Sequence, residues 1–374
     1  MDNILALMYS SEFNPANYEG LCNVRPDYML PFGGRYRIID FALSNLTNYD
    51  ISNVILFAGN KMRSTLDHVG NGRSWELNRR RGGLSIVPPN FDKSNPSEIS
   101  TYYDAMRAFE DSNAEYVFIT NPMYINKVDI SDARERVKEN DTDVLIFTKK
   151  TKDKDGYFLN HRLINSDEND LPINVGLNLG TSDRFDLFAG SILMKKDKFI
   201  KVLRFAVEMN NISSLLSAIF EYPSALSKEF YRVDNQLEII MNANSFFDAN
   251  MKLLDRENFN NLFYEDGQVY TKSKDEPSTS YTKESKVKNS LVANGSIIEG
   301  EIENSIIFRG VTIKKGAVIK NSIIFQDTII EEDAILNFVI TDKGTKVGEN
   351  VKLFGNRSHP YVSNKNEVLE DRSF

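Results

Sequence analysis

The chain has 374 residues, of which 45 are Lys or Arg and 53 are Asp or Glu, giving a formal net charge of -8. This length favours two domains, and 41% hydrophobic residues are enough to build their cores. The acidic balance argues against nucleic acid or an anionic membrane as a partner, because both attract basic proteins. A single cysteine, Cys22, excludes an intrachain disulfide. With no basic signal sequence and no run of about 18 apolar residues, we expect a cytoplasmic protein.

Apolar runs alternate with amphipathic stretches through residues 1–256. Four runs have the continuous apolar character of strands covered on both faces, at 4–9, 54–58, 116–120 and 144–148. Helices are predicted over 38–47, 102–111, 129–140 and 246–254. This alternation indicates an α/β domain with a doubly wound, mostly parallel, Rossmann-like sheet.

The composition changes after this region. Residues 257–286 are predicted as a linker, since 265–286 are rich in Ser, Thr, Lys, Asp and Glu. The sequence NSIIF at 304–308 then recurs at 321–325, and small residues followed by aliphatic ones recur every six residues. A six-residue step is typical of a parallel β-helix, which we place at 287–356, with a polar tail at 357–374. A β-sandwich with Asn and Gly turns is the alternative.

Three segments carry a resemblance to a known family. They read PFGGRYRIIDFALSN at 31–45, HVGNGRSW at 68–75 and ANMKLL at 249–254. These segments resemble the hallmark PFGGxYRIIDFxLSN, HIGNGxxW and EANMDLL motifs of the glucose-1-phosphate adenylyltransferases, or ADP-glucose pyrophosphorylases. The resemblance covers nearly the whole chain and implies a nucleotidyltransferase-like domain followed by a left-handed β-helix. Active members of this family make ADP-glucose and diphosphate from ATP and glucose 1-phosphate, with Mg²⁺.

The glycine-rich phosphate loop of active relatives is replaced in this chain. The glycines of their GGxGxR loop become Ser11, Glu12 and Asn14, and its arginine becomes Ala16. Side chains hinder the approach of backbone N–H groups to phosphate, and the carboxylate of Glu12 would repel it. The lysine of the family's KPA segment falls on Asp27, so an anion replaces a cation. The alternative is a different loop that binds nucleotide in its own way.

The two metal-binding aspartates that the resemblance implies are also absent. The aspartate of the GDHxYxMD motif falls on Met123, and that of the DVGT motif falls on Ile239. A thioether and a hydrocarbon are poor ligands for Mg²⁺, which prefers hard oxygen atoms. We therefore expect no catalytic residue, metal or cofactor on this chain, with a metal site shifted to Asp129 as the alternative. The combined losses predict a rate lower by roughly 10⁴ or more.

Five arginines are candidates for an effector or anion site. The resemblance implies a sugar-phosphate effector for Arg25, and Arg37 is the arginine of the YRIID segment. A local basic run consists of Arg79, Arg80 and Arg81. The structural alternatives are a solvated turn for the run and an ion pair with Asp40 for Arg37.

The motif segments of the fold are retained, whereas the phosphate-binding and metal-binding residues are replaced. This combination predicts a regulatory, largely non-catalytic subunit of the GlgD type in glycogen biosynthesis. The resemblance implies that such a subunit pairs with a catalytic homologue and modulates it, in a hetero-oligomer that we expect to be a tetramer. Three alternatives stay open: an active adenylyltransferase with a rearranged site, a β-helix acyltransferase, and a homo-oligomeric metabolite sensor.

Overall fold

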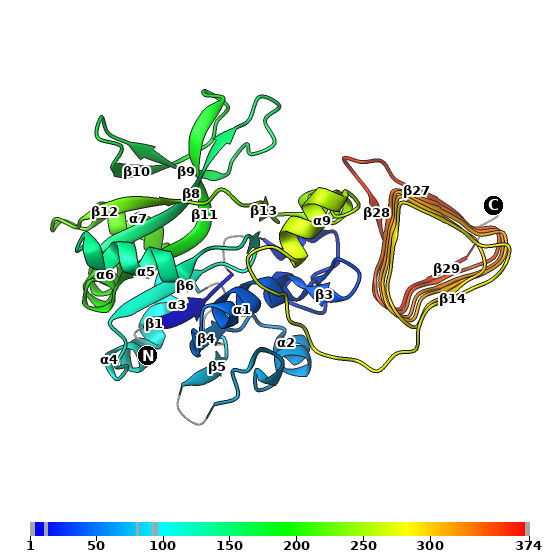
Figure 1. Cartoon of the computed structure of the whole chain (residues 1–374), viewed down its shortest axis with the longest axis horizontal. Coiled ribbons are helices and arrows are strands. Elements are labelled where there is room, and N and C mark those ends of the chain that lie inside the picture. Colours follow the sequence, from blue (N-terminus) through cyan, green and yellow to red (C-terminus); the bar gives the residue numbers. More distant parts are fainter. Residues whose placement is uncertain (1–3, 11–13, 80–81, 91, 93–95, 371–374) are drawn as a thin grey trace.

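The computed structural model describes residues 4–10, 14–79, 82–90, 92 and 96–370 (Figure 1). An α/β domain is followed by a connection and then by a triangular stack of parallel strands. Among the described residues, no helix has both the length and the apolar character needed to cross a membrane.

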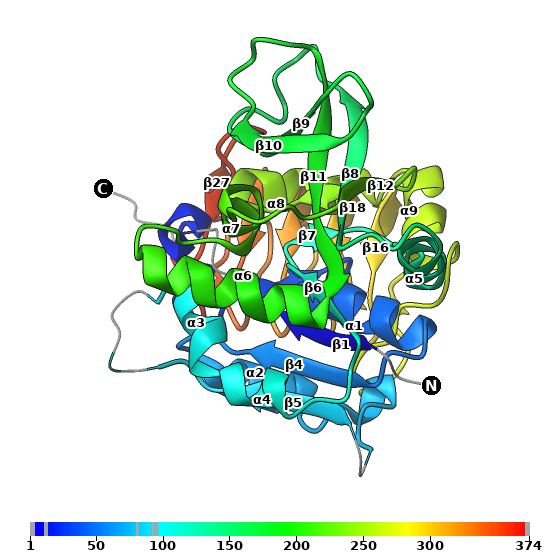
Figure 2. The same ribbon diagram turned by 90° about the vertical axis from the view of Figure 1, so that its left-hand side faces the viewer.

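A nine-stranded sheet forms the centre of the first domain (Figure 2). Its strands are β1 (Ile4–Met8), β4 (Asn53–Phe57), β5 (Gly83–Val87), β6 (Tyr116–Thr120), β8 (Val144–Lys152), β9 (Arg162–Ser166), β10 (Pro172–Leu177), β11 (Arg184–Lys195) and β12 (Lys228–Arg232). The order β6-β1-β4-β5 is parallel, whereas β11 runs antiparallel to both β6 and β8. The predicted α/β domain is confirmed, and β11 makes its sheet mixed.

Helices lie between these strands and after the last of them. They are α1 (Ile38–Asn48), α2 (Met62–Val69), α3 (Glu98–Asp104), α4 (Met106–Glu110), α5 (Ile130–Glu139), α6 (Lys196–Met209), α7 (Leu215–Glu221), α8 (Ala243–Lys252) and α9 (Arg256–Phe263). Short 3₁₀ turns lie at η1 (Pro15–Tyr18), η2 (Asp27–Met29) and η3 (Arg73–Trp75). The single helix predicted at 102–111 is wrong, because Ala105, with φ -100° and ψ 10°, separates α3 from α4.

Two pairs of short strands extend the first domain toward the second. β2 (Pro31–Phe32) pairs with β3 (Tyr36–Arg37), and β7 (Tyr124–Ile125) pairs with β13 (Glu238–Ile239). The turn between β2 and β3 needs glycine, since Gly33 has φ 58°. The side-chain oxygen of Asn250 on α8 accepts a 3.0 Å hydrogen bond from the N–H of Gly33. The PFGG and ANM segments are therefore in direct contact.

Residues 280–369 form a left-handed parallel β-helix of three sheets. The first sheet contains β14 (Ser280–Tyr281), β17 (Ile297–Ile298), β20 (Thr312–Ile313), β23 (Ile329–Ile330), β26 (Lys346–Val347) and β29 (Val368–Leu369). The second contains β15 (Lys286–Lys288), β18 (Glu301–Glu303), β21 (Val318–Lys320), β24 (Ile335–Asn337) and β27 (Lys352–Phe354). The third contains β16 (Leu291–Val292), β19 (Ile306–Ile307), β22 (Ile323–Ile324), β25 (Val339–Thr341) and β28 (Tyr361–Val362).

The repeated NSIIF segments stack on one another in the third sheet. Ile306 lies opposite Ile323, so one copy is displaced from the next by one coil. The hydroxyl of Ser305 accepts a hydrogen bond from the N–H of Ser322, which ties the two copies together at the corner. The coils extend beyond the expected range 287–356 at both ends, because β14 begins at residue 280 and β29 ends at residue 369.

The two domains meet in a shared hydrophobic cluster, and the interior of the β-helix forms a second cluster of its own. Phe308 and Phe325 of the repeat belong to the same buried cluster as the strands of the first domain. The ring of Phe325 lies 6.1 Å from that of Phe246 on α8, in an edge-on arrangement. Such pairs contribute packing beyond simple burial. The second domain therefore supports the region where the first domain's candidate site lies.

Candidate functional site

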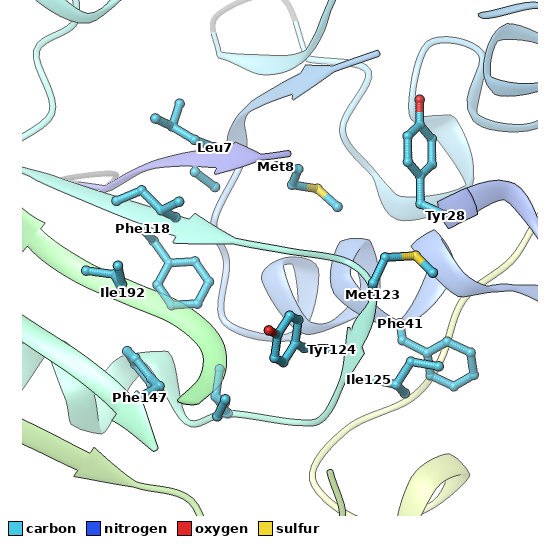
Figure 3. Close-up of a cluster of buried hydrophobic side chains, with 14 of the residues drawn as sticks. Leu7, Met8, Tyr28, Phe41, Phe118, Met123, Tyr124, Ile125, Phe147 and Ile192 are labelled. Atoms are coloured by element: carbon cyan, nitrogen blue, oxygen red, sulfur yellow. The ribbon is translucent and has the colours of Figure 1, made fainter. Parts of the chain in front are cut away.

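The candidate site lies at the carboxyl ends of β1 and β6, where a doubly wound sheet places its ligands. β7 and β13 border this region, and Figure 3 shows the cluster of buried side chains that fills it. Met8, at the end of β1, is completely buried in this cluster.

Met123 and Ile239 lie on adjacent chain segments, and the register pairs Ile239 with Tyr124, the residue that follows Met123. The N–H of Ile240 donates a 3.0 Å hydrogen bond to the carbonyl oxygen of Met123. Met123 is fully buried and Ile239 is 2% exposed. Met123 lies among Met8, Tyr28 and Phe41 in the cluster of Figure 3. These positions offer sulfur and hydrocarbon, so they do not fit the Mg²⁺ that the family uses.

Carboxylates near these positions are engaged elsewhere. Glu238 precedes Ile239, and Lys252 on α8 donates to its two oxygens at 2.9 and 3.1 Å. Burial alone would lower the pKa of Lys252, but Glu238 raises it overall. Asp129 caps α5 by accepting a hydrogen bond from the N–H of Asp132 at 2.9 Å. Within the described residues, no group of three or more His, Cys, Asp or Glu side chains could hold a metal ion.

Tyr18 fills space beside the two substituted positions, and sequence reasoning missed it. It ends the 3₁₀ turn η1 and is fully buried. Its hydroxyl donates a 2.9 Å hydrogen bond to the carbonyl oxygen of Ile240. Burial raises the pKa of this hydroxyl, so it stays a neutral donor. The apolar closure of the site therefore includes the segment that follows the phosphate-loop position.

Asp27 is buried where the resemblance implies a lysine. Its carboxylate accepts hydrogen bonds from the hydroxyl of Ser10 at 2.9 Å and from the N–H of Tyr28 at 2.8 Å. Burial raises the pKa of Asp27 to about 6, against the lowering effect of these hydrogen bonds. A group that is neutral or anionic cannot attract a triphosphate as a lysine does.

Arg25 is held by a carboxylate of the second domain. Its guanidinium donates to the two oxygens of Asp342 at 2.8 and 3.1 Å and to the carbonyl oxygen of Leu21 at 2.9 Å. The side chains of Arg25 and Asp342 are 6% and 0% exposed. Arg25 thus already has an anionic partner, supplied from 317 positions away in the chain. Sequence reasoning missed Asp342, because no local pattern marks it.

Arg37 does not form the ion pair proposed for it with Asp40. Its guanidinium donates to the carbonyl oxygen of Met29, and its backbone N–H donates to Asp40 at 3.0 Å. Burial and the neighbouring Arg25 lower the pKa of Arg37 to about 10. The partner of the Asp40 side chain is instead His68, whose Nε2 lies 2.7 Å from Oδ1. The correction follows from the position of Asp40 in the first turn of α1, where it caps the helix.

The other predicted residues are not gathered into this site. Asn14 is exposed and accepts a hydrogen bond from the N–H of Ala16 at 3.0 Å. Arg79 is exposed and donates to the carbonyl oxygen of Glu76. Four further predicted residues lie outside the described part of the chain: Ser11, Glu12, Arg80 and Arg81.

A small pocket remains beside the closed cluster. Its lining includes Tyr9 at the end of β1, Thr120 and Asn121 at the end of β6, and Glu98 and Tyr102 on α3. The cavity has a volume of about 30 Å³. The hydroxyl of Thr101 lies 3.3 Å from that of Tyr9. The pocket carries uncharged polar groups and the carboxylate of Glu98 at the carboxyl end of the sheet.

Comparisons with known proteins agree with this architecture. Residues 277–359 match the family described as GlmU-like, C-terminal hexapeptide. The glycogen biosynthesis protein GlgD of Bacillus subtilis (strain 168) is 33% identical over 342 residues, covering 91% of this chain and 89% of that protein. GlgD of Geobacillus stearothermophilus is 32% identical over 305 residues, covering 80% and 78%. A glucose-1-phosphate adenylyltransferase of Clostridium perfringens (strain 13 / Type A) is 28% identical over 357 residues, covering 91% and 90%.

The similarity to the first of these relatives covers 91% of this chain, so it extends through both domains. The chain belongs to the glucose-1-phosphate adenylyltransferase family, together with the GlgD glycogen biosynthesis proteins.

Proposed function

We propose that this chain acts in glycogen biosynthesis as a regulatory, largely non-catalytic subunit that pairs with a catalytic homologue and modulates it. The observation that carries this proposal is the closed apolar packing around Met123 and Ile239. Nucleotidyl transfer needs a metal ion to offset charge on the attacked phosphate. Two relatives are named as glycogen biosynthesis proteins and another as a glucose-1-phosphate adenylyltransferase, which supports a place for this chain in the same process.

The electrostatics of the site support the same proposal. Asp27 is a buried acid whose nearest partners are a hydroxyl and a backbone N–H. Among the predicted anion-binding arginines, Arg25 is the nearest in sequence to Asp27. Its charge is neutralised by Asp342. A triphosphate entering here would find neither a free guanidinium at Arg25 nor an ammonium at position 27.

The sugar-phosphate effector is expected to act on the assembly rather than at Arg25 of this chain. A phosphate would have to displace a bidentate carboxylate that is fully buried. Such an exchange leaves an uncompensated charge behind, which is strongly unfavourable. We therefore place effector control on the partner subunit, with this chain changing the partner's response.

An active enzyme with a rearranged site is the second candidate function. The observation that favours it is the pocket lined by Tyr9, Thr120 and Asn121, which is open at the carboxyl end of the sheet. The lining also includes Glu98, an anion that accepts a 3.0 Å hydrogen bond from the N–H of Leu215, so the pocket offers no substitute for the missing cation.

The decisive experiment measures ADP-glucose formation by three samples: the purified chain, a catalytic glucose-1-phosphate adenylyltransferase, and their mixture, each with and without sugar phosphates. We expect no turnover above background from the chain alone. In the mixture we expect a changed rate or a changed dependence on sugar phosphate. The matched control is Met123→Leu, a swap of similar volume that should leave the effect of mixing unchanged, because the thioether is only a packing group.

Two outcomes would contradict the proposal. A mixture whose rate and effector response equal those of the catalytic enzyme alone would refute the regulatory role. Turnover by the purified chain at an enzymatic rate would establish the rearranged site instead.

A further inference from the structure

Asp342 lies at a corner of the β-helix that faces the first domain. It directly follows β25 of the third sheet, which is the sheet that packs on the first domain (Figure 1). Its backbone N–H donates to the hydroxyl of Ser363 at 2.9 Å, and its carbonyl oxygen accepts from the hydroxyl of Thr345 at 2.7 Å. Asp342 and Thr345 have no exposed surface, and Ser363 is 1% exposed. The corner therefore fixes the carboxylate of Asp342 in one position.

The coils place Asp342 at a position that two earlier coils fill with phenylalanine. β19, β22 and β25 pair in register, and the residues that directly follow them are Phe308, Phe325 and Asp342. Both phenylalanines belong to the hydrophobic cluster shared with the first domain. An apolar residue therefore suits this position, and replacing a buried ion pair with apolar groups is often neutral or stabilising. Packing against the first domain does not explain why an acid is present.

Arg25 holds Asp342 as an arginine holds a free oxyanion. Nη2 of Arg25 donates to Oδ1 at 2.8 Å and Nη1 donates to Oδ2 at 3.1 Å. This planar fork of donors matches the geometry of carboxylate and phosphate ions. The backbone N–H of Lys343 adds a third donor at 2.6 Å. A guanidinium and a backbone N–H around one buried carboxylate are the donor set of an oxyanion site.

Further positive charge surrounds this site. Arg25 is close enough to Arg37 to lower the pKa of its guanidinium. Lys61 also acts on the same surroundings, because Arg25, Lys61 and Asp342 all influence the thiol of Cys22. The ammonium of Lys61 donates to the backbone carbonyl oxygen of Cys22 rather than to a carboxylate. Without the carboxylate of Asp342, these cations would attract a free anion.

We propose that Arg25 is an oxyanion site that this chain fills with its own Asp342, which acts as a built-in ligand and shuts out free phosphate and carboxylate ions. A tethered carboxylate competes as an intramolecular ligand, at an effective concentration on the order of millimolar or higher. A free anion would also have to leave Asp342 buried without its partner, which is strongly unfavourable. Exclusion of anions is a property of this chain alone, so it goes beyond the regulatory role proposed above.

The test uses Asp342→Ala, which removes the carboxylate and leaves the guanidinium of Arg25 without its ligand. Formate and inorganic phosphate are titrated into the full chain by calorimetry, with chloride keeping the ionic strength constant. We expect Asp342→Ala to bind at least one probe about tenfold or more tightly than the natural chain does. The unfolding midpoint of the variant should rise with that probe, because a ligand that binds the folded state stabilises it. The midpoint of the natural chain should follow ionic strength only.

The matched control is Arg25→Met/Asp342→Leu, which lacks both charges and places an apolar residue where the earlier coils have phenylalanine. This double variant should fold and respond to neither probe. If Asp342→Ala does not fold in chloride, formate or phosphate should restore its folding.

Three results would overturn the proposal. The first is an Asp342→Ala chain that neither binds nor is stabilised by either probe. The second is a double variant that responds as strongly as Asp342→Ala, which would place the anion away from Arg25. The third is a natural chain that binds a probe as tightly as Asp342→Ala and loses this binding in the double variant. No step measures turnover or needs a catalytic subunit, so each result is distinguishable from failure of the proposed function.

Discussion

Loss of the Arg25–Asp342 pair should uncouple the two domains. In Arg25→Met the apolar stem is retained, but Asp342 loses hydrogen bonds of 2.8 and 3.1 Å while remaining fully buried. Asp342 still accepts a 2.6 Å hydrogen bond from the N–H of Lys343. In Asp342→Leu the guanidinium loses its counter-ion and keeps the carbonyl oxygen of Leu21. Each single change therefore leaves one charge buried and uncompensated.

The expected magnitude follows from that burial. Breaking a buried ion pair by removing one partner costs about 3–5 kcal/mol, whereas replacing both partners with apolar groups is often neutral. Against a total stability of roughly 5–15 kcal/mol, either single variant should be severely weakened. The double variant Arg25→Met/Asp342→Leu should lie within about 2 kcal/mol of the natural chain. The coupling energy between the two changes should then be at least about 3 kcal/mol.

The assay is unfolding by guanidinium, followed by fluorescence and by circular dichroism. Trp75 is the only tryptophan and is buried in the first domain, so fluorescence reports on that domain while dichroism reports on both. In the single variants the two signals should separate, because the domains then unfold independently. The control is Arg107→Met, since the Arg107–Asp111 pair is 93% and 71% exposed and should contribute little. Coincident signals together with a loss below about 1 kcal/mol in Arg25→Met would refute the reasoning.

Three further changes test the closed site. Asp27→Asn should leave stability almost unchanged near pH 4 and raise it by about 3 kcal/mol at pH 8, measured by unfolding at both pH values. The stability difference has this sign because the pKa of Asp27 in the folded chain, about 6, exceeds its value in the unfolded chain. Protonated Asp27 is compatible with the fold at low pH, and that stability is lost as the pH rises through 6. A stability difference between Asp27→Asn and the natural chain that is the same at both pH values would contradict this prediction. Tyr18→Phe should cost about 1–2 kcal/mol in the same assay by leaving the Ile240 carbonyl oxygen without its donor, and a neutral effect would contradict the bond. Met123→Asp/Ile239→Asp should lose several kcal/mol and gain no turnover, because two carboxylates enter a closed core; a stable variant with Mg²⁺-dependent activity would show that the cleft is open.

Long buried elements could be predicted from the sequence because their signal is local. β1 and β6 are buried along their whole length and are apolar up to Thr120 at the end of β6, and both predicted strands are confirmed. The helix α1 was predicted from its apolar spacing and begins at Ile38 as expected. The β-helix was predicted from its period, because each coil repeats the same corner.

What could not be predicted depends on contacts between distant residues or on elements too short for a pattern. β14 has two residues, both exposed, so the sequence has no apolar pattern that would predict the first coil. Asp342 is one acid among many in the sequence, and only the fold gives it Arg25 as a partner. Tyr18 belongs to a polar segment, and its burial follows from the space left beside Ile240.

The family motifs divide into residues that hold the fold and residues that would perform chemistry. Gly33 and Asn250 come from two motifs and hydrogen-bond to each other, and Asp40 and His68 come from two motifs and form a pair. Neither contact involves the metal positions, so both serve the scaffold whether or not a reaction occurs. At the position of a lost ligand, Met123 has become a packing group with no exposed surface. Resemblance in the motifs therefore reports on the scaffold, and the side chains at the metal positions must be considered separately before an activity is assigned to a member of this family.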